Sequence, residues 1–143
     1  MNLQAGHYFL EFPDNLKLEK EEVNFEAIQR TSSHWTIEDG DFSIRIHLEE
    51  KMNPSDLGEF ILSCTKQRVS LSDVCINGIE GKKYGEYSVG RSWIDWWMKE
   101  GDQMICINLQ GDGFPSDDQK NRLEGVIKSL TTNRSEQGVV GNA

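Results

Sequence analysis

Apolar and polar residues alternate over much of the first fifty positions, and this two-residue period is typical of β-strands. The pattern predicts strands over His7–Phe12, Asn24–Arg30, His34–Glu38 and Phe42–Leu48. Asp39-Gly40-Asp41 separates the last two runs, and an Asp-Gly pair between alternating segments predicts a tight hairpin. One face of the second arm should be buried, because it carries only large apolar side chains: Phe42, Ile44, Ile46 and Leu48.

Two later segments change to the spacing of an amphipathic helix. The first has an apolar stripe of Leu57, Phe60, Ile61 and Cys64. It is predicted over about residues 54–68, beginning at Asn53-Pro54, because asparagine caps helices and proline fits the first helical position. The second is predicted over about residues 117–130, with a stripe of Leu123, Val126, Ile127 and Leu130. Ser116 and Gln119 form a capping-box pattern at its start.

Four β-like runs lie between the two helices: Leu71–Ile76, Lys82–Val89, Ser92–Lys99 and Met104–Gln110. Their separators are short, so the runs should be consecutive antiparallel neighbours in a meander. In the last run Ile105, Ile107 and Leu109 should face the core. The predicted class is α+β, with a meander of about six to seven strands packed by two helices. Residues 1–130 should form one domain, and the polar residues 131–143 a disordered tail.

Three of the four tryptophans lie within five positions of the run Ser92–Lys99. In a strand, Ile94, Trp96 and Met98 point to one side and form a natural core face. The opposite side carries Trp93, Asp95, Trp97 and Lys99. Two interpretations of Trp93 and Trp97 stay open. They pack beneath a helix, or they lie at a protein interface, where they could stack on a cation or a guanidinium.

The formal net charge is −9, and the excess of acids is uneven. Residues 1–60 hold 13 acids and 5 bases, whereas residues 61–143 hold 11 acids and 10 bases. This charge argues against nucleic acid or an anionic membrane as a partner and permits a basic protein. No apolar run approaches the roughly 20 residues needed to cross a bilayer. The N-terminus also lacks the features of a secretory signal, so we expect a cytoplasmic protein.

The candidate protein-binding residues are the acids around the hairpin together with the tryptophan-rich strand. The acids are Glu38, Asp39, Asp41, Glu49 and Glu50, and Asp95 joins Trp93 and Trp97 in the strand. Acidic inhibitors associate faster with basic targets through long-range attraction. The alternative for the acids is a solvated face that keeps the protein in solution.

No pattern of catalytic or metal-binding residues emerges. His7, His34 and His47 are widely spaced and do not form a two-histidine metal motif. Cys64, Cys75 and Cys106 are isolated and odd in number, and we expect them to be buried, reduced thiols. Neither a phosphate-binding loop nor a nucleophile motif is present. We therefore predict no catalytic residue, no metal and no cofactor.

Three segments carry a resemblance to a known family. They are Tyr8-Phe9-Leu10-Glu11-Phe12-Pro13, Ile76-Asn77-Gly78-Ile79-Glu80-Gly81, and the closing stretch from Arg122 to Leu130. In this pattern, over residues 7–130, the chain resembles the superfamily of PsbP-like and DcrB-like domains. The resemblance implies an antiparallel sheet packed between helices. It also implies a binding protein, because such domains serve as photosystem accessory subunits, as a nuclear GTPase-release factor, and as adaptors or chaperones of secreted effectors.

These features favour a non-enzymatic protein-binding module. The specific hypothesis is a bacterial immunity protein that neutralises a toxin by occluding it, and its partner would be a basic toxin or a secreted effector. One alternative is a chaperone or adaptor for a secreted effector. Another is a small-ligand-binding protein or an enzyme with a pocket between the sheet and a helix. The oligomeric state is not predicted.

Overall fold

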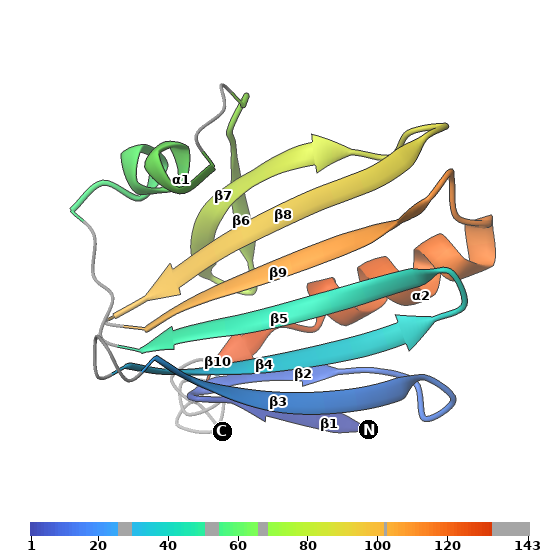
Figure 1. The fold of residues 1–143 in the computed structure, drawn as a ribbon, viewed down its shortest axis with the longest axis horizontal. Coiled ribbons are helices and arrows are strands. Elements are labelled where there is room, and N and C mark those ends of the chain that lie inside the picture. The colour runs from blue at the N-terminus through green and yellow to red at the C-terminus, as the bar shows by residue number, and fades with distance from the viewer. Residues whose placement is uncertain (26–29, 51–54, 66–68, 102, 133–143) are drawn as a thin grey trace.

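The computed structural model describes residues 1–25, 30–50, 55–65, 69–101 and 103–132, and the backbone alone for residues 21–25, 30–32 and 49–50 (Figure 1). Within these ranges it has ten strands and two helices. The strands are β1 (Asn2–Ala5), β2 (Tyr8–Glu11), β3 (Lys17–Phe25), β4 (Arg30–Asp39), β5 (Phe42–Glu50), β6 (Ser72–Ile76), β7 (Ile79–Glu86), β8 (Arg91–Glu100), β9 (Gln103–Asp112) and β10 (Thr131–Thr132). The helices are α1 (Leu57–Thr65) and α2 (Asp117–Lys128), and in this described part neither is long and apolar enough to span a membrane.

The strands form two antiparallel sheets. The large sheet has seven strands in the order β3-β4-β5-β9-β8-β7-β6, and the small sheet has three in the order β1-β2-β10. The predicted α+β class is confirmed, as is the meander of the four strands between the helices. The prediction of a single sheet of six to seven strands is wrong. The small sheet pairs the two ends of the chain, and β1 and β10 are too short to show an alternating pattern.

Several boundaries differ from the sequence-based prediction. The strand predicted over Asn24–Arg30 is described only at its ends: Asn24 and Phe25 close β3, Arg30 opens β4, and residues 26–29 lie outside the described residues. The charged stretch from Lys17 instead belongs to β3, an edge strand, and charges on an edge discourage pairing with other chains. The tail predicted from residue 131 begins with Thr131 and Thr132 paired to β2, and residues 133–143 lie outside the described residues.

The core lies between one face of the large sheet, α2 and the small sheet. As predicted, the apolar faces of β5 and β9 and the stripe of α2 are buried. The face of β8 formed by Ile94, Trp96 and Met98 is buried with them. The fully buried Tyr8 ties the small sheet to the turn between β8 and β9: its hydroxyl donates to the Gln103 carbonyl (2.7 Å) and accepts from the Glu100 amide (2.9 Å).

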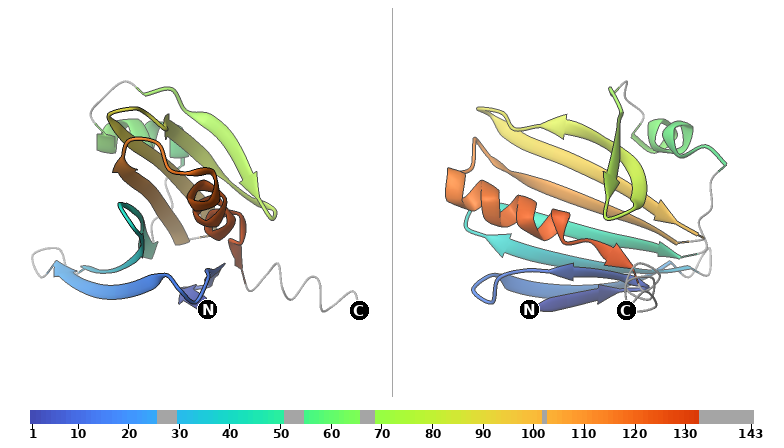
Figure 2. Two further views of the ribbon diagram at one scale, coloured as in Figure 1. Left: turned by 90° about the vertical axis from the view of Figure 1, so that its right-hand side faces the viewer. Right: turned by 180° about the vertical axis from the view of Figure 1, so that it is seen from behind.

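Helix α1 packs less completely than its apolar stripe predicts. Only Ile61 of that stripe is buried, and Cys64 is exposed. The helix lies beside β6 and β7 at the border of the large sheet, where little surface is available to cover it (Figures 1 and 2). Its first turn is capped by Asp56, whose Oδ1 accepts from the Glu59 amide (2.9 Å). The predicted cap, Asn53, lies outside the described residues.

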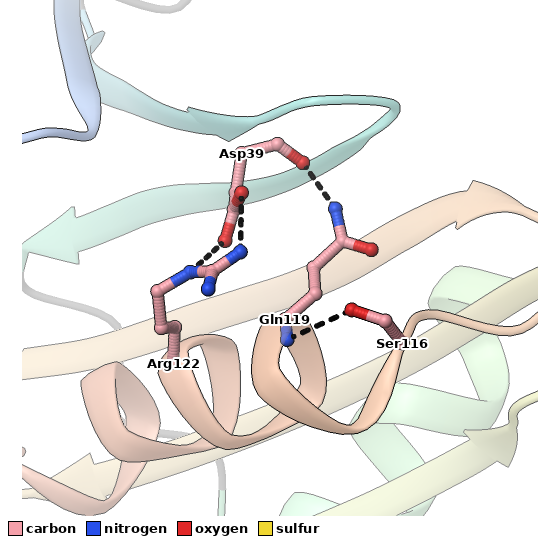
Figure 3. A network of polar contacts seen from close by, with 4 residues as sticks. All are labelled: Asp39, Ser116, Gln119 and Arg122. Atoms are coloured by element: carbon pink, nitrogen blue, oxygen red, sulfur yellow. Dashed lines mark hydrogen bonds and ion pairs between the residues drawn. The ribbon is translucent and has the colours of Figure 1, made fainter.

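Helix α2 begins as predicted and is joined to the β4–β5 hairpin (Figure 3). Ser116 Oγ accepts from the Gln119 amide (3.2 Å), and Gln119 Nε2 donates to the Asp39 carbonyl (2.6 Å). The Asp39 carboxylate accepts from Arg122 Nε (2.9 Å) and Nη2 (3.2 Å), and this contact raises the pKa of the Arg122 guanidinium. Gly40 follows with φ +60°, as the tight hairpin turn requires. Asp39 therefore fastens the hairpin to the helix.

Replacing Asp39 with alanine removes both hydrogen bonds to Arg122, so Tm should fall by about 3–8 °C in thermal unfolding followed by circular dichroism. Asp41→Ala is the matched control, because Asp41 is exposed in the same turn, and it should change Tm by less than about 2 °C. Equal changes for the two variants would contradict a stabilising role of the contact between Asp39 and Arg122.

Candidate protein-interaction surface

The face of the large sheet that points away from α2, here called the open face, carries polar and aromatic side chains. Strand register aligns these side chains in rows across the strands. One row contains Glu38, Ser43, Gln110, Trp93 and Glu86. The next contains Thr36, Arg45, Asn108, Asp95 and Tyr84. The register therefore brings the tryptophan-rich strand into one surface with the hairpin.

Trp93 is held in place although its side chain is 42% exposed. Its Nε1 donates to Asp95 Oδ2 (2.8 Å), and the Arg91 guanidinium lies 5.9 Å from the ring centroid. Arg91 is itself oriented by Gln110 Oε1, which accepts from Nη2 (2.7 Å), and by Asp112 at 3.4 Å. A large aromatic ring with restricted motion loses little conformational entropy when a partner covers it.

Asp95 is only 5% exposed, although the sequence places it on the polar side of the strand. Its Oδ1 accepts from Asn108 Nδ2 (2.7 Å) and its Oδ2 from Trp93 Nε1. Burial, followed by hydrogen bonding to Asp95 and the charge of Asp95, raises the pKa of the neighbouring Tyr84 hydroxyl. The carboxylate is buried because Trp93 and Trp97 flank it on β8 and Tyr84 is its register partner on β7.

Trp97 is more covered than Trp93. Its half-buried ring meets Phe60 of α1 edge to face, with centroids 6.1 Å apart and planes at 77°. On β9 its register partner is Cys106, and burial, followed by the charge of Asp95, raises the pKa of this thiol. The two tryptophans therefore differ: Trp97 packs against α1, and Trp93 stays exposed.

A groove of about 560 Å³ lies beside α1 and is lined by Leu57, Asp73, Val74, Cys75, Glu80, Gly81, Lys82 and Lys99. This is the location that a pocket between the sheet and a helix would take. Two of its charged groups, Lys82 and Asp73, form an ion pair with each other. Cys75 is exposed here, as Cys64 is on α1, so the prediction that the cysteines are buried is wrong for both. Each lies near an edge of the large sheet, where fewer neighbouring side chains cover it.

Two loops at the end of the sheet where β8 begins expose large apolar side chains. Val89 in the β7–β8 loop is 85% exposed, and Phe114 in the β9–α2 loop is 61% exposed. The loops are joined by a hydrogen bond from the Gly113 amide to the Gly90 carbonyl (2.8 Å). Val89, Trp93 and Phe114 are here called the loop-end patch. The sequence missed it because the β-like run Lys82–Val89 included Val89, whereas β7 ends at Glu86, and because Phe114 lies in a loop.

Acidic residues surround the loop-end patch. Glu86 and Asp112 are exposed at the ends of β7 and β9. Asp117 and Asp118 are exposed in the first turn of α2. The β4–β5 turn lies against this same helical turn through the hydrogen bond between Gln119 and Asp39 (Figure 3). Asp41, in that turn, is exposed.

The predicted acidic residues do not form one cluster. Glu38 is exposed in the row of Trp93, and Asp41 lies near the loop end. Asp39 is buried against Arg122. Glu49 and Glu50 pair with Met104 and Gln103 at the far end of β5, about 25 Å along the strand from the turn, and their side chains are outside the described residues. An extended strand separates residues that the sequence places close together.

The histidines add no metal centre to this surface. His34 and His47 stack across β4 and β5 with ring centroids 4.2 Å apart. In the part of the chain that the structure describes, no group of three or more histidine, cysteine or acidic residues is arranged to hold a metal ion.

Comparison with known proteins identifies the fold and leaves the family open. No protein-family model matches the chain, and no curated protein matches it. The fold is similar to a crystal structure of a protein from Bacteroides thetaiotaomicron VPI-5482, with a TM-score of 0.54 and 14% sequence identity. The similarity covers 89% of this chain and 45% of that one, so the chain spans less than half of that protein's length. The relation to PsbP-like and DcrB-like domains stays a prediction.

If Trp97 packs beneath α1, Trp97→Ala should lower the free energy of unfolding by about 2–4 kcal/mol, as truncation of a packed aromatic side chain does. Phe114→Ala removes an exposed ring and should lower it by less than about 1 kcal/mol. Urea unfolding followed by circular dichroism measures both variants. Unchanged stability of Trp97→Ala would show that α1 does not depend on this ring.

Proposed function

We propose that this chain is a non-enzymatic protein-binding module that contacts a basic protein through the loop-end patch. The observation that carries this proposal is the exposure of Val89, Trp93 and Phe114 together at one end of the sheet. Apolar patches with a polar rim are characteristic of protein interaction sites, and tryptophan is enriched among residues that dominate binding energy.

The charge of the rim supports a basic partner. Glu86, Asp117 and Asp118 are exposed at this end of the sheet, and Glu38 and Asp41 are exposed on the adjoining hairpin, whereas Asp112 is paired with Arg91. Such an acidic rim accelerates association with a positively charged surface. A narrower form of the proposal is a bacterial immunity protein that acts in the cytoplasm and occludes a basic toxin.

The groove beside α1 would serve the alternative of a small-ligand pocket. We base the proposal on the loop-end patch instead, because Asp73 and Lys82 in the groove already neutralise each other. No comparable internal pairing removes the apolar surface of Val89 and Phe114 from solvent.

The test replaces apolar residues of the patch and measures binding to the partner. A tagged copy expressed in its native host captures candidate partners, with a photo-crosslinking side chain at position 89 or, as the control, at position 62. With the purified pair, Phe114→Asp and Val89→Asp should each weaken binding about tenfold or more, because a charge enters the apolar contact. Leu62→Asp is the matched control, because Leu62 is also an exposed apolar residue (40%) but lies on α1.

The same pair tests the charge argument. The association rate constant measured by stopped flow should fall as salt rises from about 50 to 500 mM, because salt screens long-range attraction. Wild-type binding by both Phe114→Asp and Val89→Asp, or crosslinking from position 62 alone, would overturn the proposed surface. An association rate that is indifferent to salt would overturn the basic partner.

A further inference from the structure

Asp95 is a buried carboxylate that lacks a cationic partner. The groups around it, the Trp93 and Asn108 N–H donors and the Tyr84 hydroxyl, are all uncharged. Among the described residues no lysine, arginine or histidine forms an ion pair with it. Buried charges in proteins are normally paired, because removing a charge from water costs several kcal/mol unless an opposite charge replaces the solvent.

Aromatic rings surround this carboxylate on three sides. Trp93 and Trp97 lie two residues before and after Asp95 on the same face of β8, and Tyr84 is its register partner on β7. The faces of aromatic rings attract cations, and tryptophan does so most strongly. Trp93 already has the Arg91 guanidinium beside its ring at 5.9 Å, so a guanidinium is compatible with this position.

Asn108 lies on the fourth side of the site, and its amide oxygen has no hydrogen-bond donor. It is 8% exposed, its Nδ2 donates to Asp95, and its buried Oδ1 has no hydrogen-bond partner. Turning the amide over would place Oδ1 against the carboxylate, which would repel it. The site therefore lacks a positive charge beside Asp95 and an N–H donor beside Asn108.

We propose that Tyr84, Trp93, Asp95, Trp97 and Asn108 form a receptor for one arginine side chain of the protein partner. This inference rests on the proposed function, because Trp93 belongs to both the loop-end patch and the receptor. A partner that covers Val89 and Phe114 is thus in position to insert the side chain. Arginine fits better than lysine, since its planar guanidinium stacks on indole rings and donates several hydrogen bonds in different directions.

Two arginines of the described residues lie next to the site, and neither forms an ion pair with Asp95. Arg91 is engaged with Gln110 and Asp112. Arg45 is exposed on β5, on the far side of Asn108 from Asp95, and is the register neighbour of Asn108. Its charge opposes the entry of a second cation, so removal of that charge should strengthen binding of the partner's arginine.

The test uses N-acetyl-arginine amide as the probe, titrated into the full ¹⁵N-labelled chain, with the four tryptophan indole signals as the readout. The Trp93 and Trp97 signals should shift saturably, and the signals of Trp35 and Trp96 on the opposite face should not. N-acetyl-citrulline amide, which has nearly the same shape without the charge, should bind about tenfold more weakly or not at all.

Three variants connect the effect to the named residues. Asp95→Asn should weaken the binding of the arginine probe about tenfold, and Arg45→Gln should strengthen it. Glu11→Gln, at an exposed acid of β2 in the small sheet, should leave it within about twofold. The comparison of arginine with citrulline uses the unaltered chain, so it decides the proposal even if Asp95→Asn fails to fold. Equal shifts with both probes, no saturable shift, or full binding by Asp95→Asn would overturn the arginine receptor.

The outcome is separable from that of the proposed function. If the probe does not bind but Phe114→Asp still loses the partner, the protein-binding function stands and the arginine receptor is wrong. If the probe binds through Asp95 but Phe114→Asp and Val89→Asp keep the partner, the loop-end surface is wrong and the receptor stands.

Discussion

The antiparallel pairing of β5 with β9 is the contact on which the rest of the structure depends. It extends from Phe42 opposite Gly111 to Glu50 opposite Gln103, and it joins the N-terminal strands to the meander between the helices. Because side chains alternate between the two faces, one register decides both sides of the sheet at once. If β5 shifted by one residue against β9, Arg45 would enter the core and Ile44 would be exposed.

The two faces of the sheet have different consequences for function. The apolar face is covered by α2 and the small sheet and supplies the stability. The open face places a charged residue, Asp95, in a position that is almost closed to solvent and surrounds it with tryptophans and an asparagine. Such an arrangement stabilises the fold less than apolar packing would, and it keeps the exposed Trp93 ring in a single orientation. We infer that the fold gives up some stability here and gains a fixed orientation of the Trp93 ring, on which the proposed binding surface depends.

Much of the local structure could be predicted from the sequence because its causes are local. The Asp-Gly turn, the capping by Ser116 and the apolar faces of β5, β8 and β9 depend on neighbouring residues and on simple periods, and they are confirmed. The small sheet could not be predicted, since β2 pairs with both the first residues and Thr131–Thr132. The weak burial of α1 escaped prediction for a related reason: an apolar stripe shows which side of a helix is suited to packing, whereas the border of the sheet limits how much is covered.

For the candidate site, the sequence by itself determined the composition: an acidic first part, three tryptophans on one strand, and the alternation that puts Trp93, Asp95 and Trp97 on one face. Only the tertiary structure decided how those residues differ. The register of β7 and β9 enclosed Asp95, and α1 covered Trp97. Two loops placed the exposed Val89 and Phe114 at the end of the sheet where β8 begins. It also separated the acids, burying Asp39 against Arg122 and carrying Glu49 and Glu50 to the other end of β5. The physical reason is that burial and charge pairing arise from contacts between distant segments, which no short window of sequence contains.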